Sequence, residues 1–126
     1  MQVISEALPE VVMPACPIRK VLKGQKALVT GANSGIGKGI AIALAHAGAD
    51  VVVNYRSNPE SAEEVVREAM RCGSRVYAYQ ADVSQEDQVQ AMFKRMYQEF
   101  GTIDILVNNA GLQQDAPFEQ MTLQQW

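Results

Sequence analysis

Three glycines, Gly31, Gly35 and Gly37, lie between an apolar run and a segment of helical periodicity. The apolar run over 26–30 predicts a buried strand, and apolar residues spaced three or four apart predict a helix over 36–47. Glycine permits a tight turn at Gly31, backbone approach of a ligand at Gly35 and close helix packing at Gly37. A helix N-terminus attracts anionic groups such as a pyrophosphate. The segment therefore predicts a phosphate-binding turn between a strand and a helix.

The glycine spacing alone leaves a plainer alternative open. The spacing is G-x-x-x-G-x-G rather than G-x-G-x-x-G, and no Lys-Ser/Thr pair follows as in an NTPase P-loop. The glycines could serve tight packing only. The strand, turn and helix around them favour the phosphate-binding interpretation.

Strands and helices alternate along the rest of the chain. Short apolar runs are typical of strands that are buried on both faces of a parallel sheet. Right-handed crossovers between them give an α/β fold, a Rossmann-type doubly wound parallel sheet truncated after about four strands, in the order 3-2-1-4. The predicted strands cover 26–30, 51–55, 75–81 and 103–108, and the predicted helices cover 36–47, 59–72 and 84–100.

Capping residues and apolar spacing predict the ends and buried faces of the helices. Asn58 before Pro59 predicts a helix start, and Ser84 with Asp87 resembles a capping box. Residues 122–125 have the same capping-box form, which predicts a further helix start. The apolar residues that recur at helical spacing in the first helix are Ile36, Ile40, Leu44 and Ala47. The last helix is expected to bury a stripe of Val89, Phe93, Met96 and Phe100.

Composition and charge argue against several classes of partner. The chain has 126 residues, with 11 Lys or Arg, 14 Asp or Glu and a formal net charge of −3. This balance provides no broad basic surface for nucleic acid or an anionic membrane, and no apolar stretch approaches the roughly 20 residues that span a bilayer. Cys16 and Cys72 have no metal-ligand spacing. We therefore expect no nucleic-acid, membrane or metal partner, two reduced thiols and a cytoplasmic location.

Three motifs occur in order at the ends of predicted strands. Thr30–Gly37 follows the first strand, Asp82-Val83 the third and Asn108-Asn-Ala-Gly111 the fourth. Together they resemble the short-chain dehydrogenase/reductase family over residues 24–126. We expect residues 24–126 to form an NAD(P)-binding Rossmann-type domain that is C-terminally incomplete. Residues 1–23, which hold three of the five prolines, are expected to form a flexible N-terminal arm.

The resemblance implies an activity as well as a fold. Residues 53–57 and 108–112 are similar to the glucose 1-dehydrogenase branch. This implies an oxidoreductase that transfers hydride between NAD(P) and a sugar or other secondary alcohol; reduction of a 3-oxoacyl carrier-protein thioester is the nearest alternative. The complete enzyme would take a small-molecule alcohol or carbonyl substrate and form a homo-oligomer.

The resemblance also implies how the cofactor is held. The glycine-rich turn would hold its phosphates and adjoining ribose, Asp82 would accept from the adenine amino group, and Val83 would pack on the ring. Structural alternatives are that Asp82 caps the following turn and that Asn108 and Asn109 tie neighbouring strands together. With Tyr55 and Arg56 from the end of the second strand, the predicted cofactor-binding residues are Gly31, Asn33, Ser34, Gly35, Ile36, Gly37, Asp82, Val83, Asn108, Ala110 and Gly111.

The end of the second predicted strand bears on cofactor choice. An acidic residue at this place binds the ribose 2′-hydroxyl of NAD, but this chain has Asn54-Tyr55-Arg56. A guanidinium can make a bidentate contact with a 2′-phosphate. We therefore predict acceptance of NADP, alone or alongside NAD. The alternative is that Arg56 is simply solvated.

The catalytic residues of the resembled family do not occur in this chain. That family uses a serine and a later Tyr-x-x-x-Lys motif, and neither arrangement follows Gly111. We predict no catalytic residue here and expect the 126-residue chain to be inactive alone. A protein that binds dinucleotides without catalysis is the alternative of a different class.

Overall fold

The four strands form one parallel sheet. The computed structural model describes residues 19–112 and 116–125. The sheet has the order β3-β2-β1-β4, which confirms the predicted Rossmann-type α/β fold and its strand order. Its strands are β1 (Lys26–Val29), β2 (Asp50–Tyr55), β3 (Val76–Gln80) and β4 (Ile105–Val107).

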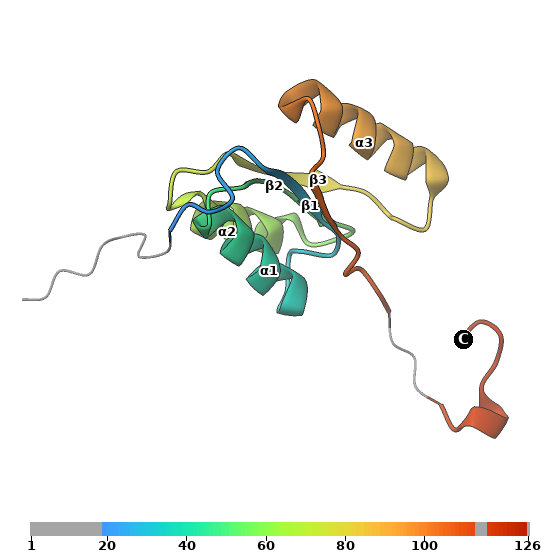
Figure 1. Ribbon diagram of the computed structural model, residues 1–126. Helices are drawn as coiled ribbons and strands as arrows, with labels where there is room; N and C mark the ends of the chain where they lie inside the picture. Colours follow the sequence, from blue (N-terminus) through green and yellow to red (C-terminus); the bar gives the residue numbers. More distant parts are fainter. Residues whose placement is uncertain (1–18, 113–115, 126) are drawn as a thin grey trace, which may run out of the picture.

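Helices lie on both faces of the sheet (Figure 1). α1 (Gly35–His46) and α2 (Pro59–Met70) pack on one face, and α3 (Glu86–Phe100) lies on the other. A short 3₁₀ helix, η1 (Phe118–Gln120), comes after β4. Among the described residues, none of the helices is both long and apolar enough to cross a membrane.

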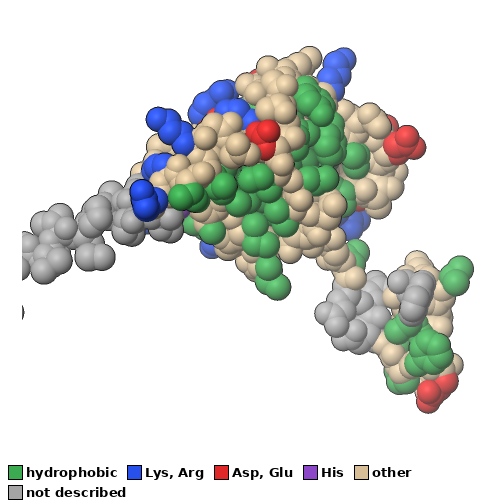
Figure 2. Space-filling model, in the orientation of Figure 1, with side chains coloured by type: hydrophobic (Ala, Val, Ile, Leu, Met, Phe, Trp, Pro, Cys, Tyr) green, Lys and Arg blue, Asp and Glu red, His purple; other side chains and the backbone are tan. Residues whose placement is uncertain are grey.

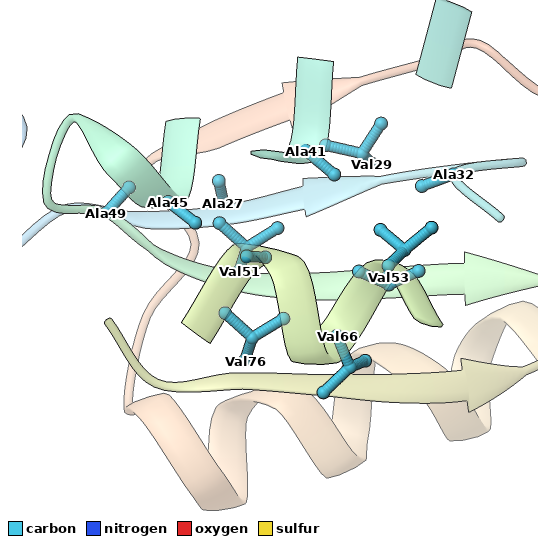
Figure 3. Packing of buried hydrophobic residues seen from close by; sticks show 12 residues of the cluster. Ala27, Val29, Ala32, Ala41, Ala45, Ala49, Val51, Val53, Val66 and Val76 are labelled. Carbon is cyan, nitrogen blue, oxygen red and sulfur yellow. The ribbon is translucent and has the colours of Figure 1, made fainter. Parts of the chain in front are cut away.

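Alternate residues of the central strands supply two separate cores. Val29 and Val53 point toward α1 and α2, where they belong to one core with Ala41 and Ala45 of α1 (Figure 3). Leu28 and Val52 point the other way, toward Met92 and other large side chains of α3. A strand reverses its side chains at every residue, so two nearly unbroken apolar strands fill both cores.

α1 buries different residues from the ones whose apolar spacing predicted the helix. Its fully buried positions are Gly37, Ala41 and Ala45, whereas Ile36 is 78% exposed. Small side chains at the buried positions let this helix lie close to the sheet. α3 buries Met92, Met96 and Phe100, while Val89 and Phe93 of the predicted stripe are only partly buried.

The start of α2 follows its predicted capping signal, and a glycine ends α3. The Asn58 side chain accepts a hydrogen bond from the Ser61 N–H at 3.2 Å, which confirms it as the N-cap of α2. Gly101 ends α3 in the left-handed conformation, with φ of 79°. Near the end of the sequence, the Gln125 side chain accepts from the Thr122 N–H at 2.9 Å, as in a capping box, and the described residues there form a turn.

The predicted capping box at the start of α3 is wrong. The N-cap is Gln85, and it makes no side-chain capping bond. The Ser84 hydroxyl donates instead to Asp82 Oδ1 at 2.6 Å, so the preceding turn has taken the group that would have capped the helix.

The sheet has an open apolar side at β4. Among the described strands, β4 pairs only with β1, and Leu106 is 46% exposed. Figure 2 shows hydrophobic side chains on this side of the molecule, between α3 and α1.

Contacts with the domain begin upstream of Gly24. Lys20 Nζ donates to the Cys72 carbonyl at 2.6 Å, and the Leu22 N–H donates to the Ala47 carbonyl at 2.9 Å. Residues 1–18 lie outside the described residues, so the predicted arm and domain boundary stay predictions.

Cys72 is disulfide-bonded, so the expectation of a reduced thiol there is wrong. The hydrogen bond from Lys20 brings the segment upstream of Gly24 close to Cys72. The spacing of residues in the sequence did not indicate this proximity.

Candidate functional site

A cleft of about 880 Å³ lies beside the carboxyl ends of β1, β2 and β3. Ligands of open α/β sheets bind at this place, where the strand order reverses. Eight of the predicted cofactor residues line it: Gly31, Asn33, Ser34, Arg56, Asp82, Val83, Ala110 and Gly111. Gly35, Ile36, Gly37 and Tyr55 do not line it, and Asn108 lines a smaller cavity of about 220 Å³ beside α3.

The glycines of the turn meet two different needs. Gly31 has φ of 60°, and a Cβ there would lie 2.9 Å from Ala110 Cα. A Cβ on Gly37 would overlap the Asn109 side chain and the Gly31 carbonyl. Gly35 has φ of 58° but open space around it, with no atom within 4 Å of a Cβ. Gly31 and Gly37 therefore serve close packing, whereas the side of Gly35 is free for a ligand.

The N-terminus of α1 is arranged to receive an anion. Its N-cap Ser34 makes no side-chain capping bond, and its first turn contains no acidic residue. By contrast, the first turns of α2 and α3 contain Glu60 and Glu86. The first N–H groups of a helix lack intrahelical acceptors and carry partial positive charge. At α1 this charge stays available to a ligand beside the cleft.

A buried asparagine fixes the turn to the sheet. Asn54 is 1% exposed, and its Oδ1 accepts from the Gly31 N–H at 3.3 Å. Its Nδ2 donates to the carbonyls of Tyr79 and Ala81, each at 3.2 Å. Asn54 therefore joins the glycine-rich turn, β2 and β3. Sequence reasoning did not give it this role, although a polar residue inside a buried apolar strand is a usable signal.

A second asparagine joins the turn to the segment after β4. Asn109 Nδ2 donates to the carbonyls of Thr30 and Gly31, each at 3.1 Å. The Thr30 hydroxyl accepts from the backbone N–H groups of Asn109 and Ala110, each at 3.0 Å. The structural alternative is thus the correct description of Asn109, while Asn108 is exposed.

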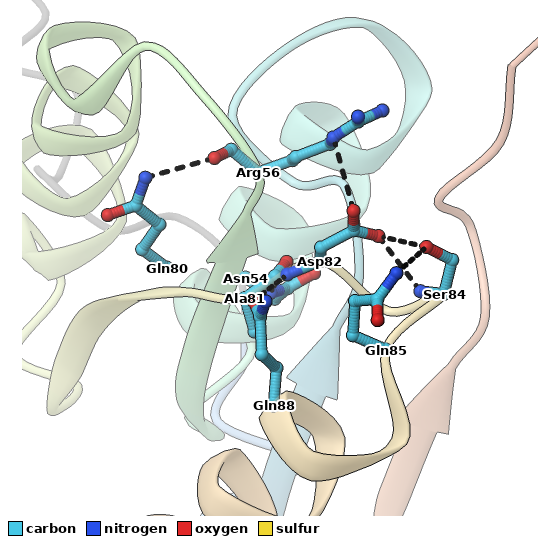
Figure 4. A network of polar contacts seen from close by, with 8 residues as sticks. All are labelled: Asn54, Arg56, Gln80, Ala81, Asp82, Ser84, Gln85 and Gln88. Carbon is cyan, nitrogen blue, oxygen red and sulfur yellow. Dashed lines mark hydrogen bonds and ion pairs between the residues drawn. The ribbon is translucent and has the colours of Figure 1, made fainter.

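Arg56 and Asp82 line the cleft side by side and face each other (Figure 4). Arg56 Nε lies 3.5 Å from Asp82 Oδ2. Asp82 Oδ1 accepts from the Ser84 hydroxyl at 2.6 Å and the Ser84 N–H at 2.9 Å. These Ser84 bonds, with a smaller contribution from Arg56, lower the pKa of Asp82. Asp82 caps its turn, as the structural alternative predicted, and its predicted contact with adenine stays a prediction.

Other candidate groups lie away from the cleft. His46, at the end of α1, has Nε2 3.0 Å from the Glu68 carbonyl and so joins α1 to α2. In the described part of the chain, no three or more His, Cys, Asp or Glu side chains are placed to hold a metal ion.

Comparisons with known proteins agree with this architecture. The sequence model of the short chain dehydrogenase family matches residues 25–126. The chain is 47% identical over 105 residues to the "Hydroxynaphthalene reductase-like protein Arp2" of Metarhizium acridum, covering 83% of this chain and 39% of that protein. It is 46% identical over 102 residues to the "3-oxoacyl-[acyl-carrier-protein] reductase FabG" of Staphylococcus aureus, covering 81% and 42%.

A solved structure is similar as well. It is a short chain dehydrogenase from Burkholderia cenocepacia in complex with NADP, with a TM-score of 0.77 and 41% identity. The match covers 82% of this chain and 42% of that one. This chain thus spans about two-fifths of the length of these relatives.

Proposed function

This chain belongs to the short-chain dehydrogenase family, and from that premise we propose that it is the NADP-binding part of an oxidoreductase. The observation that carries the proposal is the uncapped N-terminus of α1, which borders the same cleft as Arg56. Both features are suited to binding an anion, and Ser34 and Arg56 line the same cleft. A dinucleotide with a 2′-phosphate carries anionic groups at two separated places, and so it matches them.

The same features support an assignment of the groups that hold the cofactor. The first turn of α1 holds the pyrophosphate through its free N–H groups, and the open side of Gly35 leaves room for it. Arg56 binds the 2′-phosphate, and Val83 packs on the adenine ring. A nicotinamide dinucleotide held there would supply hydride-transfer chemistry. The NADP complex of the Burkholderia relative supports this assignment.

The substrate is a small carbonyl compound or secondary alcohol. The two relatives described above are named as reductases, which favours carbonyl reduction as the direction of the reaction. Oxidation of a sugar, which the similarity to the glucose 1-dehydrogenase branch implied, is the same hydride transfer in reverse. The groups that bind substrate and transfer the proton are not assigned to residues of this chain.

Removal of the Arg56 guanidinium tests the cofactor assignment. Arg56→Ala should weaken NADPH binding about tenfold or more and leave NADH binding nearly unchanged, because charge-assisted hydrogen bonds contribute roughly 1.5–3 kcal/mol. Binding is measured by titrating the purified chain with each cofactor while following nicotinamide fluorescence. Arg67→Ala, on the exposed surface of α2, is the matched control and should change neither affinity.

Two results would contradict the proposal. Equal losses of affinity for NADPH and NADH in Arg56→Ala would show that Arg56 does not bind the 2′-phosphate. Absence of binding of either cofactor to a chain that is folded by circular dichroism would remove the cofactor site altogether.

A further inference from the structure

The register of the sheet places Arg56 beside Asp82. Tyr55 and Gln80 are the last paired residues of β2 and β3, and the ladder continues with the Ala81 N–H donating to the Tyr55 carbonyl at 2.9 Å. Gln80 Nε2 also donates to the Arg56 carbonyl at 3.1 Å. Arg56, the residue after Tyr55, therefore lies beside Ala81, and its side chain reaches Asp82, the residue after Ala81.

The two partners of this ion pair differ in freedom. Asp82 is fixed, because its Oδ1 accepts two bonds from Ser84 and its N–H donates to Gln88 Oε1 at 2.7 Å. Its other oxygen, Oδ2, is left to face Arg56 (Figure 4). The Arg56 side chain is 65% exposed, compared with 25% for Asp82. Asp82 is thus a stationary anion, and Arg56 is a cation that can turn toward another partner.

We propose that Asp82 sets the discrimination between cofactors with and without a 2′-phosphate, by competing with that phosphate for Arg56. The inference rests on the proposed function, in which Arg56 binds the 2′-phosphate. A phosphate that reaches Arg56 must share the guanidinium with the Asp82 carboxylate and also lies near its negative charge. A cofactor without this phosphate meets neither effect. Asp82 therefore lowers the preference for the phosphorylated cofactor without needing to contact the phosphate.

A pair of small probes isolates this effect. Adenosine 2′,5′-bisphosphate and 5′-AMP differ only in the 2′-phosphate, so any contact of Asp82 with adenine cancels in the ratio of their dissociation constants. Asp82→Asn removes the charge and keeps an oxygen that can accept from Ser84. Calorimetric titration of the chain should show the preference for the bisphosphate rising about two- to fivefold in Asp82→Asn, as expected for an exposed ion pair.

A double-mutant cycle assigns the effect to Arg56. In an Arg56→Ala background, Asp82→Asn should leave the ratio of the two dissociation constants nearly unchanged, since the guanidinium for which Asp82 and the phosphate compete is absent. Glu64→Gln removes one negative charge from the exposed surface of α2 and is the matched control for net charge. It should leave the ratio as it is in the unmodified chain.

The outcomes separate the inference from the function on which it rests. If Arg56→Ala lowers the preference for the bisphosphate but Asp82→Asn leaves it unchanged or lowers it, the inference is wrong and the proposed function stands. The inference is also wrong if Glu64→Gln raises the ratio equally, or if the gain persists without Arg56. If Arg56→Ala does not alter the ratio, or the folded chain binds neither probe, the proposed function fails together with the inference.

Discussion

Polar side chains are used differently at the two ends of the parallel sheet. At the amino end, Lys26 Nζ lies 2.5 Å from Asp50 Oδ2, and Asp50 Oδ1 accepts from the Arg75 N–H at 2.9 Å. Asp104 accepts from the Lys26 N–H at 2.8 Å, and the Phe100 ring lies 5.5 Å from Lys26 Nζ. These groups satisfy one another, and Lys26 and Asp50 are each less than one-fifth exposed.

At the carboxyl end, only part of the polar set is satisfied within the chain. Asn54 and Asn109 hold the backbone of the turn through hydrogen bonds. Ser34, Arg56 and Asp82 instead line an open cleft. The two ends share one sheet and similar residue types, so the difference lies in whether the chain itself satisfies the charged side chains. Groups that retain free bonding capacity beside a cleft are the candidates for ligand binding.

The largest effect is expected at the carboxyl end, from Gly37→Ala. A Cβ at this position would overlap the Asn109 side chain and the Gly31 carbonyl, both of which belong to the framework of the turn. Either the helix or the turn must move, and overpacking of this kind costs about 3 kcal/mol. We expect a loss of that size in the free energy of unfolding, measured by urea denaturation, together with loss of NADPH binding.

Gly39→Ala is the matched control in the same helix. A Cβ at Gly39 would meet no atom within 4 Å, and alanine is the better helix former. This variant should be more stable than the unmodified chain by about 0.5–1 kcal/mol and should bind NADPH normally. A loss of stability in Gly39→Ala that matches that of Gly37→Ala would show that crowding against the turn is not the cause.

An intermediate effect is expected at the amino end, from Asp50→Ala. The change leaves Lys26 Nζ and the Arg75 N–H without their acceptor, and removal of one partner from a half-buried pair costs about 2 kcal/mol. Urea denaturation at pH 7 should show this loss, while NADPH affinity should be unchanged because the cleft is at the opposite end. Loss of binding in a folded Asp50→Ala chain would contradict the separation of the two ends.

Asp50 also makes the free energy of unfolding depend on pH in the acid range. Burial raises the pKa of Asp50, but hydrogen bonds from Lys26 and the Arg75 N–H, with the charges of both residues, bring it below its usual value of 3.8. The stabilisation is therefore present above about pH 4 and is lost as the pH falls through the lowered pKa of the folded chain. Between pH 5 and pH 2, the stability of Asp50→Ala should fall less steeply than that of the unmodified chain.

The parts of this structure that the sequence predicted depend on local signals. Strand order follows from apolar runs, glycine positions and the handedness of crossovers, all of which are readable along the chain. The apolar spacing predicted α1 but did not mark its buried face, because Ala41 and Ala45 are small and do not stand out in an apolar pattern. Small residues are needed there because the helix lies close to the sheet. That distance depends on tertiary packing and not on the local sequence.

The candidate site shows the same division. The glycine-rich turn and the motifs after β3 and β4 marked most of the residues that line the cleft. The framework role of Asn54 depends on an approach to Gly31, 23 residues earlier, and on the register of β2 with β3. The ion pair of Arg56 with Asp82 depends on that register as well. Such pairings join distant segments, so local periodicity contains no direct signal for them.

The smallest effect is expected from Tyr77→Phe, which sharpens the comparison at the amino end. Tyr77 packs against Phe100 with ring centroids 5.3 Å apart, and its hydroxyl is buried without a hydrogen-bond partner among the described residues. Phenylalanine keeps the ring contact and removes the unpaired group. The free energy of unfolding at pH 7 should stay unchanged or rise by up to about 1 kcal/mol.

The stability of the chain at alkaline pH distinguishes the Tyr77 hydroxyl from the hydroxyls of exposed tyrosines. Burial, with a smaller contribution from Glu99, raises the pKa of Tyr77 from 10.0 to about 12. The folded chain therefore holds this proton more tightly than the unfolded chain, and stability falls as the pH rises from 10 to 12. Tyr77→Phe should reduce that fall in urea denaturation, whereas Tyr97→Phe, at a residue 55% exposed, should not. A loss above 1 kcal/mol at pH 7 in Tyr77→Phe would mean that the hydroxyl has a bonding partner, and that this end of the sheet is fully satisfied.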